Sequence, residues 1–311
     1  MTTALYTHAD CLNHATPPGH PEQIARLKFI NEALAAPEFG PLDRRDAPDC
    51  ADADILLCHP QRYLDAIAAA EPASGTVALD ADTHMSPGSF NAARRGVGGV
   101  LAAVDAVLGG EAANAFVACR PPGHHALAET PMGFCLFGNV ALAAKHALER
   151  HGLSRVAVVD FDVHHGNGTQ ALLWDEARAM LFTSQQMPHW PGSGAPSERG
   201  AHDNIVNIPL APGTGGPEMR RAYEAQVFPA LKAFAPELLL ISAGFDAHRA
   251  DPLSDLNWST EDYAWLTGRL CDIADEVSEG RVVSTLEGGY DLQALAASTA
   301  AHVKVLMERG K

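Results

Sequence analysis

The sequence predicts a single α/β domain spanning residues 1–311, with a mainly parallel sheet flanked by helices. Short apolar runs alternate along the chain with stretches of helical period, and this alternation is typical of parallel sheets. Hydrophobic residues make up 47% of the 311 residues, which is enough for one sizeable core. The patches rich in proline and glycine fall between these elements, so they predict loops rather than domain boundaries, at residues 17–21, 121–123, 188–196 and 209–217.

The expected strands are short apolar runs, at residues 55–58, 115–119, 155–159, 179–183, 204–208, 238–242 and 282–286. The expected helices are longer stretches with apolar residues at helical spacing, at residues 91–108, 139–151, 217–234, 260–277 and 291–307. In open parallel sheets, ligands bind outside the carboxyl ends of the strands. We therefore expect polar residues that follow these runs to converge at one edge of the sheet.

The overall charge limits the partners of the protein. Twenty-two basic and 38 acidic residues give a formal net charge of −16, which disfavours binding to a nucleic acid backbone. The acidity is compatible with a cationic substrate such as a lysine-rich peptide or a polyamine, and equally with a role in solubility alone. The six cysteines form no Cys-x-x-Cys pair, which indicates reduced thiols. No signal peptide or membrane-spanning run is apparent, so a cytoplasmic protein without membrane contact is expected.

The most informative segment is Val158-Val159-Asp160-Phe161-Asp162-Val163-His164-His165-Gly166-Asn167. Asp162 and His164 lie two residues apart just past an apolar run, so on an extended chain their side chains face the same way. A carboxylate and an imidazole suit zinc, and three protein ligands would leave one position open. Taken alone, the same residues are equally compatible with a turn or a helix cap.

Three further segments place reactive residues after apolar runs. Pro121-Pro122-Gly123 holds the pair His124 and His125 in a turn. Asp246 follows the run Leu238-Leu239-Leu240-Ile241 and is a natural third ligand. Tyr290 follows Gly288 and Gly289, which allow the backbone to approach a ligand closely.

Together the four motifs resemble the zinc-dependent histone deacetylase superfamily, which includes bacterial deacetylase-like amidohydrolases and acetylpolyamine amidohydrolases. The resemblance begins at Pro18-Gly19-His20-Pro21-Glu22 and ends at Gly289-Tyr290, so it covers nearly the whole chain. It implies one zinc ion per chain with the ligands Asp162, His164 and Asp246. It also implies the catalytic residues His124, His125 and Tyr290.

The resemblance extends to residues around this centre. Asp160 matches the carboxylate behind the first histidine, and Asn167 matches the partner of the second, as in the class II branch. The substrate channel would be formed by Gly133, Phe134, Trp190, Leu253, Gly288 and the rim residue Asp82. A structural potassium ion is implied at the main-chain oxygens of Asp160, Asp162 and His164, with Ser184 and Gln185 nearby. Relatives often form homodimers or homotetramers.

We therefore expect an amidohydrolase that removes an acetyl or other acyl group from acyl-lysine or a related long-chain amine. His125 would act as general base and acid, and Tyr290 would donate a hydrogen bond to the oxyanion. Leu253 stands where a polyamine-specific relative has a glutamate, which favours acetyl-lysine. An acidic gate for acetylpolyamines would instead come from Glu129, Asp82, Asp255 or another subunit.

Two other classes of function compete with this hypothesis. A dimanganese ureohydrolase would need more metal-binding acids than the motifs supply, and a catalytically silent acyl-lysine binder would not need every reactive residue. The sequence does not decide whether the native metal is zinc, iron or cobalt. Structural or surface roles are expected for the histidines outside the motifs, namely His8, His14, His20, His59, His84, His189 and His202. His248, two residues after Asp246, is not used in the pattern of the family.

Overall fold

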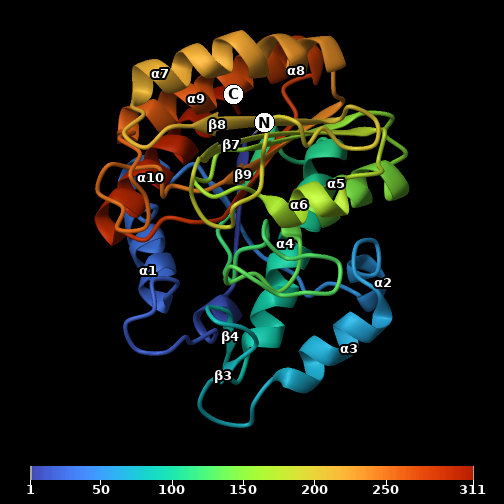
Figure 1. Cartoon of the computed structure of the whole chain (residues 1–311), viewed down its shortest axis with the longest axis vertical. Coiled ribbons are helices and arrows are strands. Elements are labelled where there is room, and N and C mark those ends of the chain that lie inside the picture. The colour runs from blue at the N-terminus through green and yellow to red at the C-terminus, as the bar shows by residue number, and fades with distance from the viewer. Residues whose placement is uncertain (1, 311) are drawn as a thin grey trace.

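The computed structural model describes residues 2–310 and is built around an eight-stranded sheet (Figure 1). Its strands are β1 (Thr3–Thr7), β2 (Asp43–Asp46), β5 (Asn114–Val117), β6 (Val156–Asp160), β7 (Ala179–Gln186), β8 (Ile205–Leu210), β9 (Leu238–Ala243) and β10 (Val282–Leu286). The spatial order is β2-β1-β5-β10-β9-β6-β7-β8, and every neighbouring pair is parallel. The expected fold class is confirmed.

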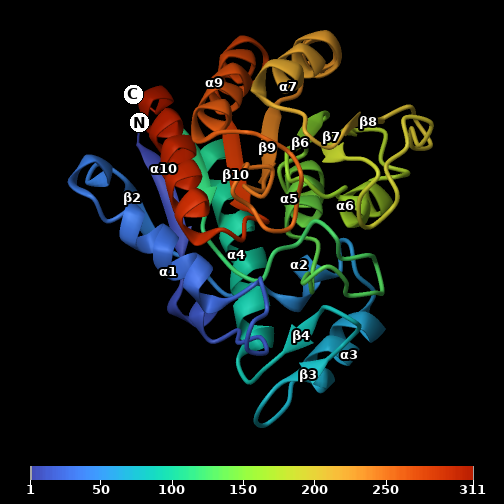
Figure 2. The ribbon, with the colours of Figure 1, turned by 60° about the vertical axis from the view of Figure 1, so that its left-hand side comes forward.

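Helices cover both faces of the sheet (Figure 2). On one face, α4 (Ser89–Leu108) packs on β5 and β10, and α5 (Asn139–Arg150) packs on β6 and β9. On the other face, α10 (Leu292–Arg309) contacts β5 and packs between α1 (Ile24–Ala33) and α9 (Thr260–Val277). The shorter elements are η1 (Ala9–Leu12), η2 (Pro37–Phe39), α2 (Asp52–Ile55), α3 (Gln61–Ala70), the hairpin β3 (Val77–Ala78) and β4 (His84–Met85), α6 (Asn167–Leu172), α7 (Gly216–Ala222), η3 (Tyr223–Val227) and α8 (Phe228–Phe234).

The prediction of a strand at residues 55–58 is wrong. This run lies at the end of α2 and in the turn that follows it. The single helical turn buries Ile55 and leaves Leu56 exposed, so the apolar run does not need a sheet to cover it. The helix expected at 217–234 is interrupted by the π-turn η3, just before Pro229. Proline has no N–H to donate and its ring crowds the preceding turn, so the regular helix does not run undisturbed into Pro229.

The middle of the sheet forms the core and positions the site. Every residue of β6 and β9 is buried, as expected for parallel strands with helices on both faces. The strands β5, β10, β9 and β6 are consecutive in the sheet, and each is followed by one of the four motifs. The motifs therefore meet at the carboxyl edge of the sheet.

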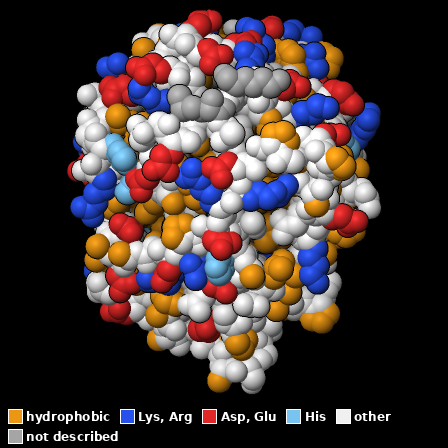
Figure 3. Space-filling view, turned by 180° about the vertical axis from the view of Figure 1, so that it is seen from behind, with side chains coloured by type: hydrophobic (Ala, Val, Ile, Leu, Met, Phe, Trp, Pro, Cys, Tyr) orange, Lys and Arg blue, Asp and Glu red, His pale blue; other side chains and the backbone are white. Residues whose placement is uncertain are grey.

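The surface carries no block of a single charge on the face seen in Figure 3, where acidic and basic side chains are interspersed. Over residues 2–310, every helix is too short or too polar for a bilayer crossing.

Candidate active site and metal centre

Three potential metal ligands converge beyond the ends of β6 and β9. Nδ1 of His164 lies 3.1 Å from Oδ1 of Asp162 and 3.1 Å from Oδ2 of Asp246. One donor atom from each residue lies within 4.8 Å of the other two. Both carboxylates are fully buried, and His164 is nearly so. An imidazole and two carboxylates facing one point form a donor set that suits a divalent transition metal.

Backbone groups fix the two carboxylates from behind. Gly288 N–H donates to Oδ2 of Asp162 over 2.8 Å, and Val163 N–H donates to Oδ1 of Asp246 over 2.9 Å. A Cβ atom at Gly244 or Gly288 would overlap the carboxylate of Asp162. The absence of side chains at these two positions is therefore what lets the acids be buried here.

The charges of the cluster also favour a bound cation. Burial, together with the negative charge of Asp162, raises the pKa of Asp246 to about 7. Burial disfavours a charged imidazole at His164, yet its hydrogen bonds to Asp162 and Asp246 raise its pKa to about 10. The two acids thus attract positive charge strongly enough to overcome the cost of burying it, and the residues present fit a metal ion.

The tandem histidines lie beside this cluster, with ring centroids 3.9 Å apart. Nδ1 of His124 lies 2.9 Å from Oδ2 of Asp160, and Nδ1 of His125 lies 2.7 Å from Oδ1 of Asn167. Their backbone is held by the buried carboxylate of Glu287, which accepts hydrogen bonds from the N–H of Gly123 (2.7 Å) and of His124 (3.1 Å).

The two histidines differ in their electrostatics. Burial and the positive charges of His124 and His164 hold the pKa of His125 well below its usual range. At His124 burial acts in the same direction, but the carboxylates of Asp162 and Asp160 raise its pKa well above the usual range. Because the amide oxygen of Asn167 only accepts, the His125 proton resides on Nδ1 and leaves Nε2 free as a base.

Tyr290 completes the constellation from the loop after β10. Its N–H donates to Oδ2 of Asp251 over 2.6 Å, and the Arg26 guanidinium lies 4.9 Å from the centre of its ring. Burial raises the pKa of the Tyr290 phenol well above its usual range, so the hydroxyl remains a hydrogen-bond donor.

A cavity of about 230 Å³ opens above these groups and is lined by Asp82, His125, Gly133, Phe134, His164, His189, Trp190, Leu253 and Tyr290. Phe134 lies edge-on to Tyr290 with a centroid distance of 5.8 Å, and Trp190 lies edge-on to His125 at 4.7 Å. Of the predicted channel residues, Gly288 is not in the lining, because it packs below the cavity against the carboxylates of the cluster.

The side chains of the two residues expected near the potassium ion, Ser184 and Gln185, have hydrogen-bond partners within the protein. Oγ of Ser184 lies 2.7 Å from the Tyr223 hydroxyl, and the Gln185 amide donates to the Gly194 carbonyl over 2.7 Å. Both are buried on β7. Of the three acids considered as a gate in this chain, Asp82 lines the cavity, whereas Glu129 pairs with Arg62 and Asp255 accepts from Gln186.

Sequence reasoning missed three residues of the site. Glu287 and Asp251 hold the backbone of the tandem histidines and of Tyr290. His189 was expected in a structural or surface role, but it lines the cavity and stacks on His164 with a centroid distance of 4.9 Å. The one sequence signal for this position was that His189 lies in the proline-rich patch 188–196, which was predicted to be a loop. His248 is not among the three residues of the cluster.

A parallel α/β fold with these groups at its carboxyl edge has the features of a metal-dependent hydrolase. Comparison of the sequence and the structure with known proteins identifies the family. A model of the histone deacetylase domain matches residues 20–306. The chain is 46% identical over 312 residues to an uncharacterized protein of Synechocystis, covering 99% of this chain and 100% of that protein. It is 38% identical over 313 residues to the histone deacetylase-like amidohydrolase of Pseudomonas aeruginosa, covering 93% and 81%. The crystal structure of the HDA15 HD domain superposes with a TM-score of 0.93 at 31% identity, covering 99% and 90%.

The chain therefore belongs to the histone deacetylase family. This membership supports a hydrolase of the deacetylase type in a family that is generally metal-dependent.

Proposed function

We propose that this chain is one catalytic domain that uses zinc to hydrolyse the amide of an acetylated lysine side chain. The observation that carries the proposal is the position of His125. This neutral base lines an aromatic-walled cavity together with His164 of the Asp162-His164-Asp246 cluster and Tyr290. We infer that a potassium ion at Asp160, Asp162, His164, Ser184 and Gln185 has a structural role.

The acid and base steps are assigned to His125. When bound, zinc would polarise the amide carbonyl and lower the pKa of a water molecule. His125 Nε2 then accepts the proton of the attacking water, and its low pKa keeps it available for that task near neutral pH. The same nitrogen passes the proton to the leaving amine. Asn167 keeps the other ring nitrogen protonated throughout.

Tyr290 stabilises the charge that develops on the substrate. Its protonated hydroxyl donates to the tetrahedral oxyanion, and removal of one such donor typically costs about 100- to 1000-fold in rate. Asp251 and Arg26 fix the backbone and the ring of Tyr290, so that the hydroxyl is oriented before the substrate arrives.

The cavity walls favour a substrate with an aliphatic stem. The aromatic faces of Phe134 and Trp190 exclude water and contact methylene groups, and Leu253 adds an apolar rim. A lysine side chain presents such a stem with an amide at its end. Asp82 at the rim has a carboxylate that accepts from Gly133 N–H over 3.2 Å and is available to a peptide backbone N–H.

An acetylpolyamine is the second substrate class, and Asp82 is the observation in its favour. It is the one acid among the residues that line the outer part of the cavity, and a polyamine carries a distant ammonium. Leu253 provides no charge for that ammonium, so we rank acetyl-lysine first.

The deciding experiment compares kcat/KM of the zinc-loaded protein on an acetyl-lysine peptide and on N-acetylated polyamines. We expect turnover of both classes with preference for the peptide, and loss of most activity in Tyr290→Phe and His125→Ala with the zinc content unchanged. A polyamine preference would reverse the ranking. Binding of the peptide without turnover, or two manganese ions per chain with activity on a guanidinium substrate, would refute the deacetylase proposal.

A further inference from the structure

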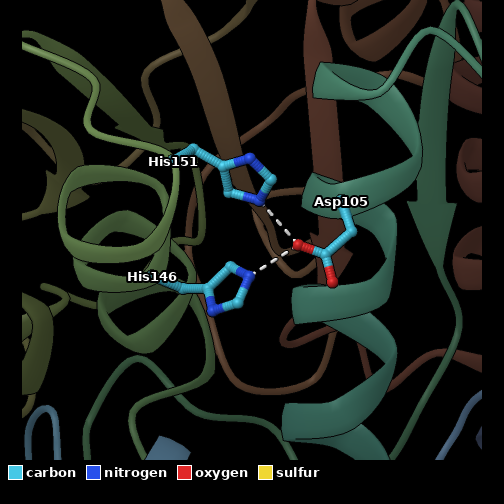
Figure 4. Close-up of side chains that lie close together, drawn as sticks. All are labelled: Asp105, His146 and His151. Atoms are coloured by element: carbon cyan, nitrogen blue, oxygen red, sulfur yellow. Dashed lines mark hydrogen bonds and ion pairs between the residues drawn. The ribbon is translucent and has the colours of Figure 1, made fainter.

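A second group of metal-ligating side chains lies between α4 and α5 (Figure 4). It consists of Asp105 on α4, His146 on α5 and His151 at the carboxyl end of α5, and is called the Asp105 cluster below. Both histidine rings point their Nε2 atoms at the same carboxylate oxygen. The distances to Oδ1 of Asp105 are 2.6 Å from His146 and 2.7 Å from His151.

This geometry is more than a surface ion pair. Two imidazoles and a carboxylate from two helices have their donor atoms within 4.8 Å of one another. Two protonated imidazoles would place like charges side by side, with ring centroids 5.4 Å apart and a single carboxylate to balance them. A divalent cation between the three donors uses the lone pairs of two neutral imidazoles and balances the carboxylate.

The site is also accessible and has room for further ligands. The side chains of Asp105, His151 and His146 are 55%, 29% and 11% exposed. A neighbouring cavity of about 140 Å³ is lined by both Asp105 and His146, so solvent reaches the inner side of the cluster. Water can therefore complete a tetrahedral coordination shell, as it does in sites with three protein ligands.

The ligand types point to a transition metal rather than to magnesium or calcium. Imidazole suits zinc, nickel, copper and cobalt, whereas magnesium and calcium prefer oxygen ligands alone. Zinc bonds of about 2.0–2.1 Å in a tetrahedron separate the ligand atoms by about 3.3 Å. The two nitrogen–oxygen contacts of the cluster would open by about 0.6 Å, within the reach of side-chain rotations at Asp105 and His151.

We propose that the Asp105 cluster is a second metal site that binds Zn²⁺ or a related transition metal and fastens the end of α5 to α4. These helices cover the strands that precede the tandem histidines and the candidate catalytic metal ligands, β5 by α4 and β6 by α5. The site contributes stability and takes no part in catalysis. It does not depend on the proposed deacetylase activity.

In the test, the protein is stripped of metal and titrated with zinc by calorimetry, and the bound zinc ions are counted by elemental analysis. We expect two equivalents in the unaltered protein and one in His151→Ala, which keeps its kcat/KM at saturating zinc. His202→Ala removes an exposed histidine outside the cluster and retains two equivalents. Zinc should also raise Tm by more in the unaltered protein than in His151→Ala, and Mg²⁺ should not replace it.

A second variant guards against a folding defect in the first. Asp105→Asn preserves the size of the side chain and should weaken the affinity for the second zinc ion by more than roughly tenfold. Even loss of a residue that only supports a metal ligand typically weakens binding by about that much. The same number of bound zinc ions with unchanged affinity in the unaltered protein and in both variants would overturn the proposal, whatever the total.

Discussion

Nδ1 of His125 faces the amide oxygen of Asn167 at 2.7 Å, whereas Nδ1 of the adjacent His124 faces the carboxylate of Asp160 at 2.9 Å. Two neighbouring imidazoles with nearly identical hydrogen-bond lengths therefore have partners of different charge. The carboxylate stabilises a protonated His124, while the amide fixes the tautomer of His125 without adding a negative charge. This difference is consistent with the proposed roles, an electrostatic one for His124 and proton transfer for His125.

Replacing Asn167 tests that separation. In Asn167→Asp the acceptor remains but gains a negative charge, which stabilises protonated His125 and raises its pKa. The acidic limb of the profile of kcat/KM against pH should then move to higher pH. In Asn167→Ala the ring loses its orientation, and kcat/KM should fall by about 10- to 100-fold at every pH. Superimposable profiles for the unaltered protein and Asn167→Asp would contradict the role of His125 as base.

Asp251 should affect turnover more than substrate binding, because it holds Tyr290 but does not line the cavity. Its carboxylate accepts from the N–H of Tyr290 over 2.6 Å and of Leu253 over 3.0 Å. Asp251→Ala should lower kcat by up to about 100-fold, as a displaced catalytic group would. Asp251→Asn keeps one acceptor oxygen and should recover part of that loss. Steady-state kinetics with zinc analysis would decide, and an increase in KM at constant kcat would argue against a positioning role.

Gly133 should tolerate no side chain. Its φ of 56° disfavours other residues, and a Cβ atom there would overlap the His125 ring and lie 2.6 Å from Cη2 of Trp190. Gly133→Ala should lower kcat/KM by about 100-fold through displacement of these rings. Gly75→Ala is the matched control, because its φ is 70° but nothing lies within 4 Å of the added Cβ. Equal effects of the two substitutions would assign the loss to backbone strain alone.

His59 should make the folded state sensitive to acid. Its Nδ1 donates to the Ala128 carbonyl over 3.1 Å, and its Nε2 accepts from Gly138 N–H over 3.0 Å, so the second bond needs the neutral ring. Burial lowers its pKa from 6.5 to about 4. The unfolded state therefore binds more protons between these values, and the stabilisation is complete above pH 6.5 and is lost as the pH falls toward 4.

The expected loss from His59 is at most about 3 kcal/mol. Urea unfolding at several pH values would measure it, with His59→Gln as the comparison. The variant should be less stable near neutral pH and should lose less of its remaining stability on acidification. His302, whose pKa burial lowers to about 3, responds in the same direction in both proteins. Parallel curves of unfolding free energy against pH would rule out a contribution from His59.

The sequence predicted the central strands and the residues after them because both depend on local pattern. Nearly all residues of β6 and β9 are apolar and all are buried, and the carboxyl end of such a strand leads directly to the site. The edge strand β2 escaped prediction for the opposite reason. Its sequence Asp43-Arg44-Arg45-Asp46 is charged throughout, and pairing with β1 on one side is enough to form it.

The supporting residues could not be predicted, because their roles depend on distant backbone groups. Glu287 accepts from Gly123 N–H, 164 residues away in the sequence, and no local motif records that contact. His189 reaches the cavity only because the loop after β7 folds back over the site. Such contacts arise from the order of strands in the sheet rather than from the neighbours of a residue in the chain.

That order also constrains when during biosynthesis the protein can acquire its metal. The strands β5 and β6 leave the ribosome early, but β10 and β9, which lie between them in the finished sheet, are synthesised last. A nascent chain that ends before β9 has two of the three candidate ligands, and it lacks both strands that lie between β5 and β6 in the finished sheet. We therefore expect the proposed metal to be bound late, once nearly the whole chain has been made, and metals to compete for the site only then.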